Sequence, residues 1–333
     1  MKGNMRLIDM VRSAGRRLAV PLAGYPGIQI TRSTVKQNEF NAELQTRSLY
    51  KLAERIQPDM IFTLMDLSTE AGALGMPVRY PIADSATVEW HPVKSVADLE
   101  QYKVVDHLYD GRVWVYLETV RLLRKKVEIP IGCYVIGPFT LAGLMMGAND
   151  IAVATIDAPQ VVEATVMFCE NVVITYAKAL LAAGADVIAI LDPTAGMLSP
   201  KSYWEFAGIS VQNIIRHLDT RTILHICGDT TRLVKSMCET GAQGLSLDSL
   251  VNFGEVAKRM PKDIVLIGNV DPVATMLHGT PEKVRKETKA LLDSMSEFEN
   301  FIPSTGCDLP AETPIENVEV FVRTVKEWEK YEK

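Results

Sequence analysis

Short apolar runs alternate with helical patterns along almost the whole chain, and this alternation constrains the fold more than any other feature. Eight such runs are followed by segments in which apolar residues recur at helical spacing. This order is typical of parallel strands joined by crossover helices, and eight strands close a (β/α)8 TIM barrel. The predicted strands are Ala19–Gly24, Met60–Met65, Ile131–Gly137, Val187–Asp192, Thr222–Cys227, Gly244–Asp248, Val265–Val270 and Asn300–Gly306.

Several of the intervening segments begin with a helix start signal. Ser199, Thr280 and Thr313 each precede a proline, so a capping hydroxyl is followed by a residue suited to the first helical position. The predicted helices are Ala42–Ile56, Arg112–Lys126, Pro159–Ala183, Pro200–Leu218, Thr231–Thr240, Pro281–Met295 and Pro314–Tyr331.

The domain organisation follows from the length and from the continuity of this pattern. Barrels of this type reach 333 residues as one unit, and no linker interrupts the chain, so a single domain over residues 1–333 is expected. Residues 1–18 are predicted to form a helix before the first strand. Residues 76–92 fit neither pattern, because prolines surround alternating apolar residues, and they predict an inserted hairpin over the barrel mouth.

Composition excludes several classes of partner. The net charge of −6 argues against nucleic acid, which requires clustered Lys and Arg. The apolar stretch Val172–Ala183 is shorter than the roughly 18 to 20 residues that span a bilayer, and Lys178 interrupts it, so no membrane segment is expected. Five cysteines without a secretory leader indicate a reducing, cytoplasmic environment.

Polar residues end most of the predicted strands. In a parallel barrel these ends meet at one face, where barrel enzymes carry their active sites. We therefore expect catalytic roles for Asp192 and Asp248, which close strands beside the candidate ligands described next. The other polar residues at these ends are Tyr25, Asp66, His225, Cys227, Asn269, Asp271 and Cys307.

A histidine and two cysteines among these residues form a candidate metal site. His225 and Cys227 are two apart on one predicted strand, so their side chains point to the same side, and Cys307 follows the last strand. One imidazole and two thiolates suit zinc, and three protein ligands leave the open position of a catalytic site. On the residues alone, the alternative is that these cysteines are buried apolar side chains.

The motifs around these residues resemble the uroporphyrinogen decarboxylase superfamily, and specifically its zinc-dependent corrinoid methyltransferase branch, whose best-known members methylate coenzyme M in methanogens. The resemblance covers the whole chain and is strongest from about residue 177 onward. The segments that carry it are Ala182–Pro193, Leu224–Gly228, Gly244–Asp248, Ile267–Val270, and Gly306–Cys307 with Thr313–Asn317.

The resemblance implies a site and a cofactor. The family's zinc ligands fall on His225, Cys227 and Cys307, and its acidic residue after the Gly-Leu-Ser motif falls on Asp248. Coenzyme M enzymes carry glutamate at that last position, so the shorter side chain puts a fourth ligand there in doubt. The corrinoid is expected on a separate partner protein, because the chain contains no Asp-x-His-x-x-Gly segment, the signature of corrinoid-carrying domains.

The sequence leaves the substrate open. Tyr25, Asp66, Tyr80 and Asn269 are candidate substrate-binding residues. Aromatic and methionine side chains suggest an apolar cavity, which favours demethylation of a methoxyarene onto cob(I)alamin. The alternatives are methyl transfer from methylcobalamin to a thiol, uroporphyrinogen decarboxylation, and a non-catalytic module in which zinc anchors a ligand. Decarboxylation is disfavoured because the chain lacks that enzyme's Arg-rich N-terminal segment. The residues proposed for the cavity are Tyr25, Phe62, Met65, Tyr80, Trp90, Phe139, Met145 and Met146.

Overall fold

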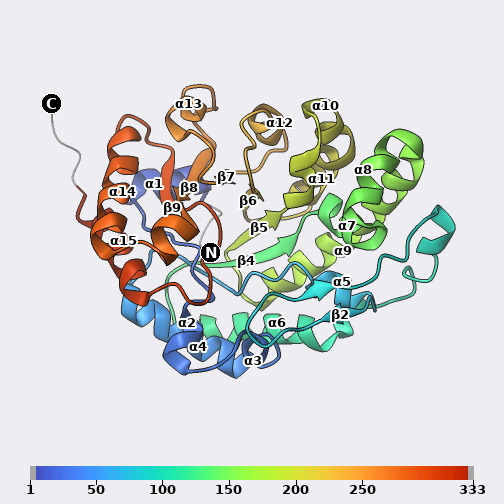
Figure 1. Cartoon of the computed structure of the whole chain (residues 1–333), viewed down its shortest axis with the longest axis horizontal. Coiled ribbons are helices and arrows are strands. Elements are labelled where there is room, and N and C mark those ends of the chain that lie inside the picture. Colours follow the sequence, from blue (N-terminus) through green and yellow to red (C-terminus); the bar gives the residue numbers. More distant parts are fainter. Residues whose placement is uncertain (1–4, 329–333) are drawn as a thin grey trace.

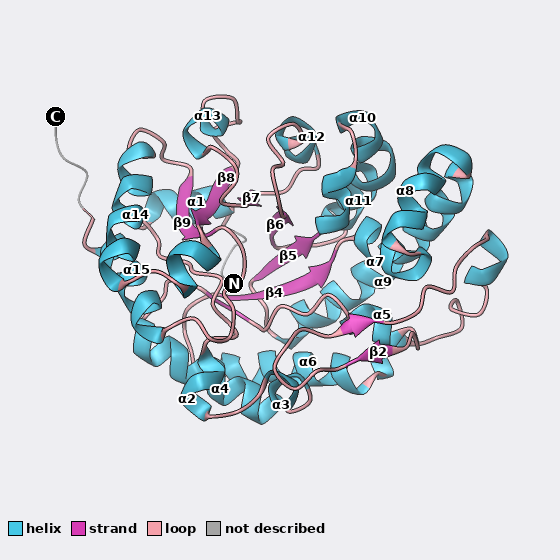
Figure 2. Ribbon diagram, in the orientation of Figure 1, coloured by secondary structure: helices cyan, strands magenta, loops and turns pink. Residues whose placement is uncertain are grey.

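Seven parallel strands curl into a barrel surrounded by helices, as a computed structural model describes for residues 5–328 (Figure 2). Every neighbouring pair of strands in this sheet is parallel, in the order β1-β4-β5-β6-β7-β8-β9. The predicted α/β barrel is confirmed. The strands are β1 (Ile61–Phe62), β4 (Ile131–Ile136), β5 (Val187–Leu191), β6 (Arg221–Ile226), β7 (Gly244–Leu247), β8 (Val265–Val270) and β9 (Phe301–Thr305).

The segment predicted as the first strand is extended but does not form a regular ladder. Residues 19–23 lie between β9 and β1, where the Val20 N–H donates to the Pro303 carbonyl (3.2 Å) and the Ala19 carbonyl accepts from the Asp59 N–H (2.9 Å). The Leu22 N–H donates to the Thr305 hydroxyl and not to its backbone (3.1 Å). Pro21 and Pro303 lack the N–H groups that a ladder needs. The prediction of a regular strand over Ala19–Gly24 is therefore wrong, although the segment is extended.

Helices form a ring around the strands (Figure 1). Ser199 and Thr280 accept the expected capping hydrogen bonds, but Thr313 does not cap, because the last helix starts one residue later, at Ile315. The prediction for that helix included residues 329–331, which lie outside the described residues. The main outer helices are α4 (Ala42–Ile56), α6 (Gly111–Arg124), α9 (Pro159–Ala183), α10 (Pro200–Tyr203), α11 (Ile209–Arg216), α12 (Val234–Glu239), α13 (Phe253–Ala257), α14 (Pro281–Ser294) and α15 (Ile315–Lys326).

Shorter elements connect the ring to the barrel. The predicted first helix appears as α1 over Leu7–Ser13, and residues 1–4 lie outside the described part of the chain. The prediction of one domain over residues 1–333 likewise extends beyond that part and stays a prediction. The connecting helices are α2 (Gly27–Thr31), α3 (Val35–Glu39), α5 (Thr69–Ala73), α7 (Pro138–Met146) and α8 (Ala148–Asp157).

Helix α9 is long and apolar enough to cross a membrane. It packs against α6, α7 and α11 and against β4, with half of its most apolar window buried, so it serves as one of the helices around the barrel. Helix α9 is apolar on several faces because it packs against other elements on several sides.

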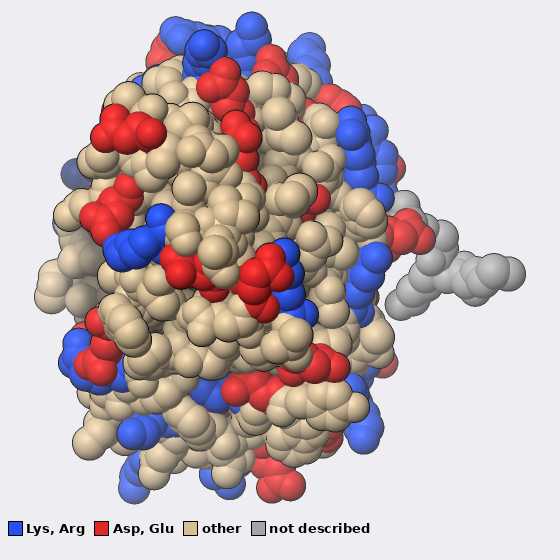
Figure 3. All heavy atoms as spheres, turned by 90° about the vertical axis from the view of Figure 1, so that its right-hand side faces the viewer, with Lys and Arg blue, Asp and Glu red and all other residues tan. Residues whose placement is uncertain are grey.

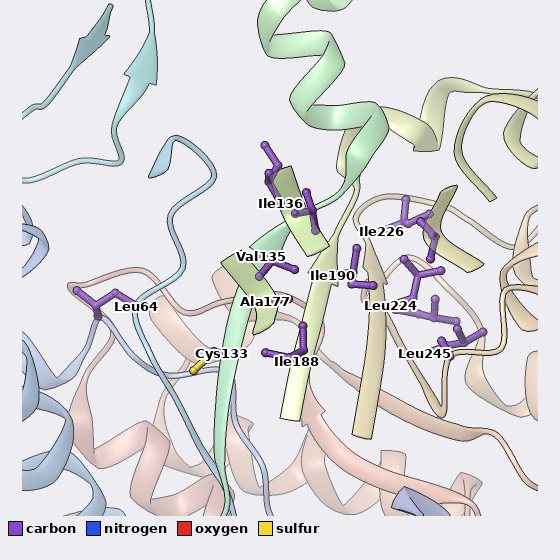
Figure 4. Packing of buried hydrophobic residues seen from close by; sticks show 14 of the residues in the cluster. Leu64, Cys133, Val135, Ile136, Ala177, Ile188, Ile190, Leu224, Ile226 and Leu245 are labelled. Atoms are coloured by element: carbon purple, nitrogen blue, oxygen red, sulfur yellow. The ribbon is translucent and has the colours of Figure 1, made fainter. Parts of the chain in front are cut away.

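Two apolar cores result from the alternation of side chains along the strands. Inward-facing residues such as Leu191, Ile223 and Ile267 fill the barrel, and α1 closes its lower end with Leu7 and Val11. Outward-facing residues pack under the helices, as Figure 4 shows for Ile188, Ile190, Leu224 and Ile226 among others.

The predicted insertion over residues 76–92 contains a short antiparallel pair. Strand β2 (Val78–Arg79) pairs with β3 (Thr87–Val88), and the Ile82 carbonyl between them accepts from the Lys36 N–H (3.3 Å). Residues 83–85 at its tip line a hollow together with the segment that follows β9.

The tight packing inside the barrel yields a stability prediction. A Cβ at Gly132 of β4 would lie 2.3 Å from the Phe62 ring, which stacks on Tyr134 with centroids 5.0 Å apart. Gly132→Ala should therefore lower the free energy of unfolding by roughly 1 to 3 kcal/mol, measured by urea denaturation. The matched control is Gly111→Ala, where the added methyl group meets nothing within 4 Å at the start of α6, and it should be neutral or stabilising. Equal destabilisation by both variants would contradict this account.

Candidate metal centre

His225, Cys227 and Cys307 converge at the mouth of the barrel. The distance from His225 Nε2 to Cys227 Sγ is 3.0 Å, from Cys227 Sγ to Cys307 Sγ 3.7 Å, and from Cys307 Sγ to His225 Nε2 3.8 Å. The three donor atoms lie within 4.8 Å of one another, as expected of groups that share one ion. His225 is buried and both cysteines are partly exposed, so the cluster is open toward the mouth.

The two thiols are not equivalent. A hydrogen bond from Cys307 lowers the pKa of Cys227, and the same bond, together with burial, raises the pKa of Cys307. The two sulfurs, 3.7 Å apart, are close enough to bind a single cation.

The strand ladder orients the imidazole. His225 pairs in register with Leu191 on one side and with Ser246 on the other, and all three side chains face the barrel interior. Its Nδ1 lies 2.9 Å from the Ser246 hydroxyl. When Nδ1 donates to this oxygen, the lone pair of Nε2 points at the two sulfurs, as a metal ligand requires.

Asp248 holds the chain immediately after Cys227. Its Oδ2 accepts from the N–H of Gly228 (2.9 Å), and its Oδ1 accepts from the N–H of Leu250 (3.0 Å). Gly228 has a φ of 82°, a conformation that suits glycine, so the turn after Cys227 depends on both residues. The described contacts make Asp248 a support for the turn, because both oxygens are engaged by backbone groups.

Asp192 faces the helices and not the barrel interior. It is fully buried, and its Oδ1 accepts from the N–H (2.7 Å) and the hydroxyl (2.6 Å) of Thr140 in α7, while its Oδ2 has no partner. Burial raises the pKa of Asp192 to about 6. Since it follows the outward-facing Ile188 and Ile190, the two-residue period directs it away from His225. The catalytic role predicted for Asp192 therefore has no direct contact between its carboxylate and the three donors to support it.

Asp66 is the centre of a second buried cluster. Its carboxylate pairs with Arg112 of α6 and accepts from the hydroxyl of Thr69 (2.9 Å), and Glu39 lies 3.9 Å from the same guanidinium. The side chains of Asp66 and Glu39 are 1% and 0% exposed, so two carboxylates share one cation out of water. Asp66 is thus engaged within the protein and offers no free oxygen to a ligand in this arrangement.

The remaining candidate substrate-binding residues lie apart from one another. The Tyr25 hydroxyl donates to the Met65 carbonyl (2.6 Å), whereas the Tyr80 ring stacks over the Arg112 guanidinium, 4.6 Å from ring centroid to Cζ. Asn269 donates its amide to the carbonyls of Asp248 (3.0 Å) and Val251 (2.7 Å). Tyr25 alone among these three lines a hollow at the mouth.

That hollow has a volume of about 300 Å³ and is acidic. The hairpin tip contributes Asp84, and the segment after β9 contributes Asp308 and Glu312, while no Lys or Arg lines it. Neither carboxylate oxygen of Asp308 receives a well-formed hydrogen bond, and burial raises its pKa well above the usual range, although the N–H groups of Gly24 and Leu309 oppose this.

The proposed aromatic cavity does not form. Phe139 and Met145 are fully buried under the helices, and Trp90 is 65% exposed on the insertion. Phe62 does face the barrel interior below His225, but the free volume there is only about 10 Å³. These side chains therefore serve mainly as packing, and they do not enclose a common site.

The sequence interpretation did not single out several polar residues that the structure places around the barrel mouth. Ser246 had a signal, because it lies two residues before Asp248 on the same strand face. The sequence signal for Asp308 was only its place after Cys307. Arg112 and Glu39 carried no sequence signal, because their partners lie on other elements. Glu70 is a further buried acid, which accepts from the Ile136 N–H (2.8 Å) and whose pKa burial raises to about 7.

Known proteins resemble this chain over nearly its full length. The sequence model of the uroporphyrinogen decarboxylase (URO-D) family matches residues 10–328. A methylcobamide:CoM methyltransferase MtbA from Methanosarcina acetivorans is 34% identical over 79% of this chain and 78% of its own. Its namesake from Methanosarcina mazei is 31% identical over 92% and 94%. A solved structure described as a methyltransferase from Methanosarcina mazei has the same fold, with a TM-score of 0.88 at 24% identity over 98% of this chain and 99% of that one.

The burial of Asp192 predicts a pH dependence of stability. Because its folded pKa of about 6 exceeds the ordinary value of 3.8, its contribution to stability is complete at low pH and is lost as the pH rises through 6. Between pH 5 and pH 8 the wild type should lose roughly 1 to 2 kcal/mol more than Asp192→Asn does, measured by urea unfolding. The control Asp157→Asn, on the exposed end of α8, should follow the wild type. If Asp192→Asn showed the same pH dependence of stability as the wild type, the raised pKa of Asp192 would be contradicted.

Proposed function

The chain belongs to the uroporphyrinogen decarboxylase family, and on this basis we propose that it transfers a methyl group from a corrinoid to a thiol at a zinc site formed by His225, Cys227 and Cys307. The main support for this proposal is that one imidazole nitrogen and two sulfurs converge at the mouth of the barrel, in a chain whose relatives are named methyltransferases.

The three donors fit zinc by type and by spacing. Tetrahedral bonds of roughly 2.0 to 2.3 Å place two sulfur donors about 3.8 Å apart and a nitrogen and a sulfur about 3.6 Å apart. The observed sulfur–sulfur distance of 3.7 Å and the distance of 3.8 Å from Cys307 to His225 match these values, and the distance of 3.0 Å from His225 to Cys227 is shorter. Three protein donors leave one position for a substrate.

Zinc bound there would keep a substrate thiol as its thiolate at neutral pH, and a thiolate attacks a methyl group far better than a thiol does. The chain's own residues set the geometry. Ser246 orients the imidazole, and Asp248 fixes the turn at Gly228, so we assign both as positioning residues. In the overall reaction the sulfur–carbon bond forms as the cobalt–carbon bond breaks, both electrons of that bond stay on cobalt, and the thiol proton is released.

The corrinoid is proposed to arrive on a separate protein. The sequence contains no Asp-x-His-x-x-Gly segment, and the relatives' names include a methylcobamide. Exposed apolar side chains on the loops after β5, β7 and β8 suit such a contact, namely Met197, Leu250 and Val273. A nucleic-acid partner finds no support, because basic and acidic side chains are interspersed over the face shown in Figure 3.

A thiol acceptor is better supported than a methoxyarene donor. The relatives are named for CoM, which is a thiol. Methoxyarene demethylation is therefore the second candidate.

Uroporphyrinogen decarboxylation fits the mouth poorly. Arg16 pairs with Asp59 (2.6 Å), and Arg17 donates to the Met295 carbonyl (2.8 Å), so both arginines lie at the end of the barrel opposite the site. The mouth instead carries carboxylates, which would repel a substrate with many carboxylates of its own. A non-catalytic zinc module is disfavoured by the open coordination position. A cytoplasmic location stays a prediction from the cysteine content.

Methyl transfer can be measured directly. The zinc-loaded protein mixed with methylcobalamin and 2-mercaptoethanol should lose the methylcobalamin absorbance and form the methyl thioether. The reverse test mixes cob(I)alamin with a methoxyarene and looks for methylcobalamin. Formation of methylcobalamin without any thiol-dependent reaction would replace the proposal with the second candidate, and failure of both reactions would remove the corrinoid assignment.

Metal analysis tests the ligands. The wild type should bind about one zinc per chain, and Cys307→Ser should lose most of it, since second- or first-shell changes commonly cost 10- to 100-fold in affinity or more. Cys238→Ser is the matched control, because Cys238 is a free, partly exposed cysteine on α12, outside the cluster. Full zinc content in Cys307→Ser, by elemental analysis, would overturn the ligand assignment.

A further inference from the structure

Tyr134 lines the same interior space as His225 and carries a buried hydroxyl group without a hydrogen-bond partner. Resting on the proposed function, we infer that this hydroxyl donates a hydrogen bond to the thiol sulfur that occupies the open position of the zinc site. Tyr134 then contacts the acceptor directly, a role that no pattern in the sequence indicated.

The strand ladder places Tyr134 just below the metal centre. It lies on β4 in register with Ala189 of β5, which in turn pairs in register with Ile223 of β6. His225 is two residues further along β6, so its level is roughly 6 to 7 Å above that of Tyr134. The long side chain of Tyr134 covers much of this height, and it lines one interior space together with His225 and Ser246.

The hydroxyl lies on the side of the metal centre and keeps its proton. The Tyr134 ring is fixed by stacking on Phe62, with centroids 5.0 Å apart and planes inclined by 24°. Burial raises the pKa of Tyr134 well above its usual value, and the charges of Asp308 and Cys307 raise it further. Because the influence of a charge weakens with distance, these causes agree with an oxygen that points toward Cys307, and the group acts as a donor.

The described residues offer this donor no acceptor. Asp308 makes no hydrogen bond with it, since both of its oxygens also lack a well-formed partner, and the Ser246 hydroxyl is engaged with His225 Nδ1 at 2.9 Å. The interior space of about 10 Å³ is at the lower limit for one water, and the other side chains that line it are apolar. An unpaired buried donor is costly, so an acceptor that enters from the mouth gains free energy by pairing with it.

A thiolate sulfur at the open position is such an acceptor. Hydrogen bonds to ionised acceptors are stronger than those to neutral ones, so the Tyr134 hydroxyl favours the thiolate over the thiol and fixes the position of its sulfur. A hydrogen bond to Cys307 would instead support the metal. Removal of the hydroxyl therefore weakens thiol binding in the first case and zinc binding in the second.

Tyr134→Phe removes the hydroxyl and keeps the ring. Because the lost group has no partner in the free protein, the free energy of unfolding should stay the same or rise, measured by urea denaturation. Zinc content should stay near one per chain. The affinity for 2-mercaptoethanol should fall roughly tenfold or more, as expected when a hydrogen bond to a charged group is lost, measured by the absorbance change of the cobalt(II)-substituted protein. In turnover with methylcobalamin, KM for the thiol should rise while kcat changes little.

Tyr203→Phe is the matched control, because the Tyr203 hydroxyl is also buried and unpartnered but lies in the outer core under the helices. It should leave thiol affinity unchanged. The inference would be overturned, with the proposed function left standing, by unchanged thiol affinity or by loss of zinc in Tyr134→Phe, or by an equal loss of thiol affinity in Tyr203→Phe. Absence of methyl transfer from methylcobalamin to any thiol by the zinc-loaded wild type would instead overturn the proposed function, and the inference with it.

Discussion

The two-residue period of side chains along parallel strands decides which residues meet in this protein. Leu191, His225 and Ser246 occupy one level of three adjacent strands and all point inward. Cys227 is two residues beyond His225, so it reaches the same cluster at the mouth. Asp192 is one residue beyond Leu191, and the same period directs it toward α7 and the helices. A shift of one residue in the register of β6 would turn both His225 and Cys227 away from the barrel interior.

The strands bring the donors together, but the loops hold them there. Asp248 accepts the Gly228 N–H, and Asn269 donates to the backbone of the same Asp248 and of Val251, so the ends of β6, β7 and β8 are linked by side-chain hydrogen bonds. These bonds give the polar residues at the strand ends a role in holding the loops. They fix the positions of the candidate metal ligands, which a catalytic site needs within a fraction of an ångström.

Buried charge is concentrated on the side of the mouth where β1 meets the insertion. Asp66 and Glu39 share Arg112, and the rings of Tyr80 and Phe40 cover its guanidinium, with centroids 4.6 and 5.3 Å from Cζ. A charge buried in this way is stable only with its partners in place. The insertion is therefore fastened to the barrel by electrostatic and cation–π contacts, and its acidic tip faces the acidic segment after β9 across the hollow.

The sequence by itself determined the barrel and the pairing of His225 with Cys227 in the candidate metal site, because both depend on local periods. Runs of apolar residues predicted all seven regular strands, and the i, i+2 spacing of His225 and Cys227 on one strand placed them on one face. Only the tertiary structure decided the rest. It showed that prolines interrupt the strand ladder at residues 19–23 and that Asp66 forms a buried ion pair with Arg112. It also showed that the hollow at the barrel mouth is lined by acidic side chains. These features depend on contacts between elements far apart in the chain, and no local pattern encodes which distant charge a side chain will meet.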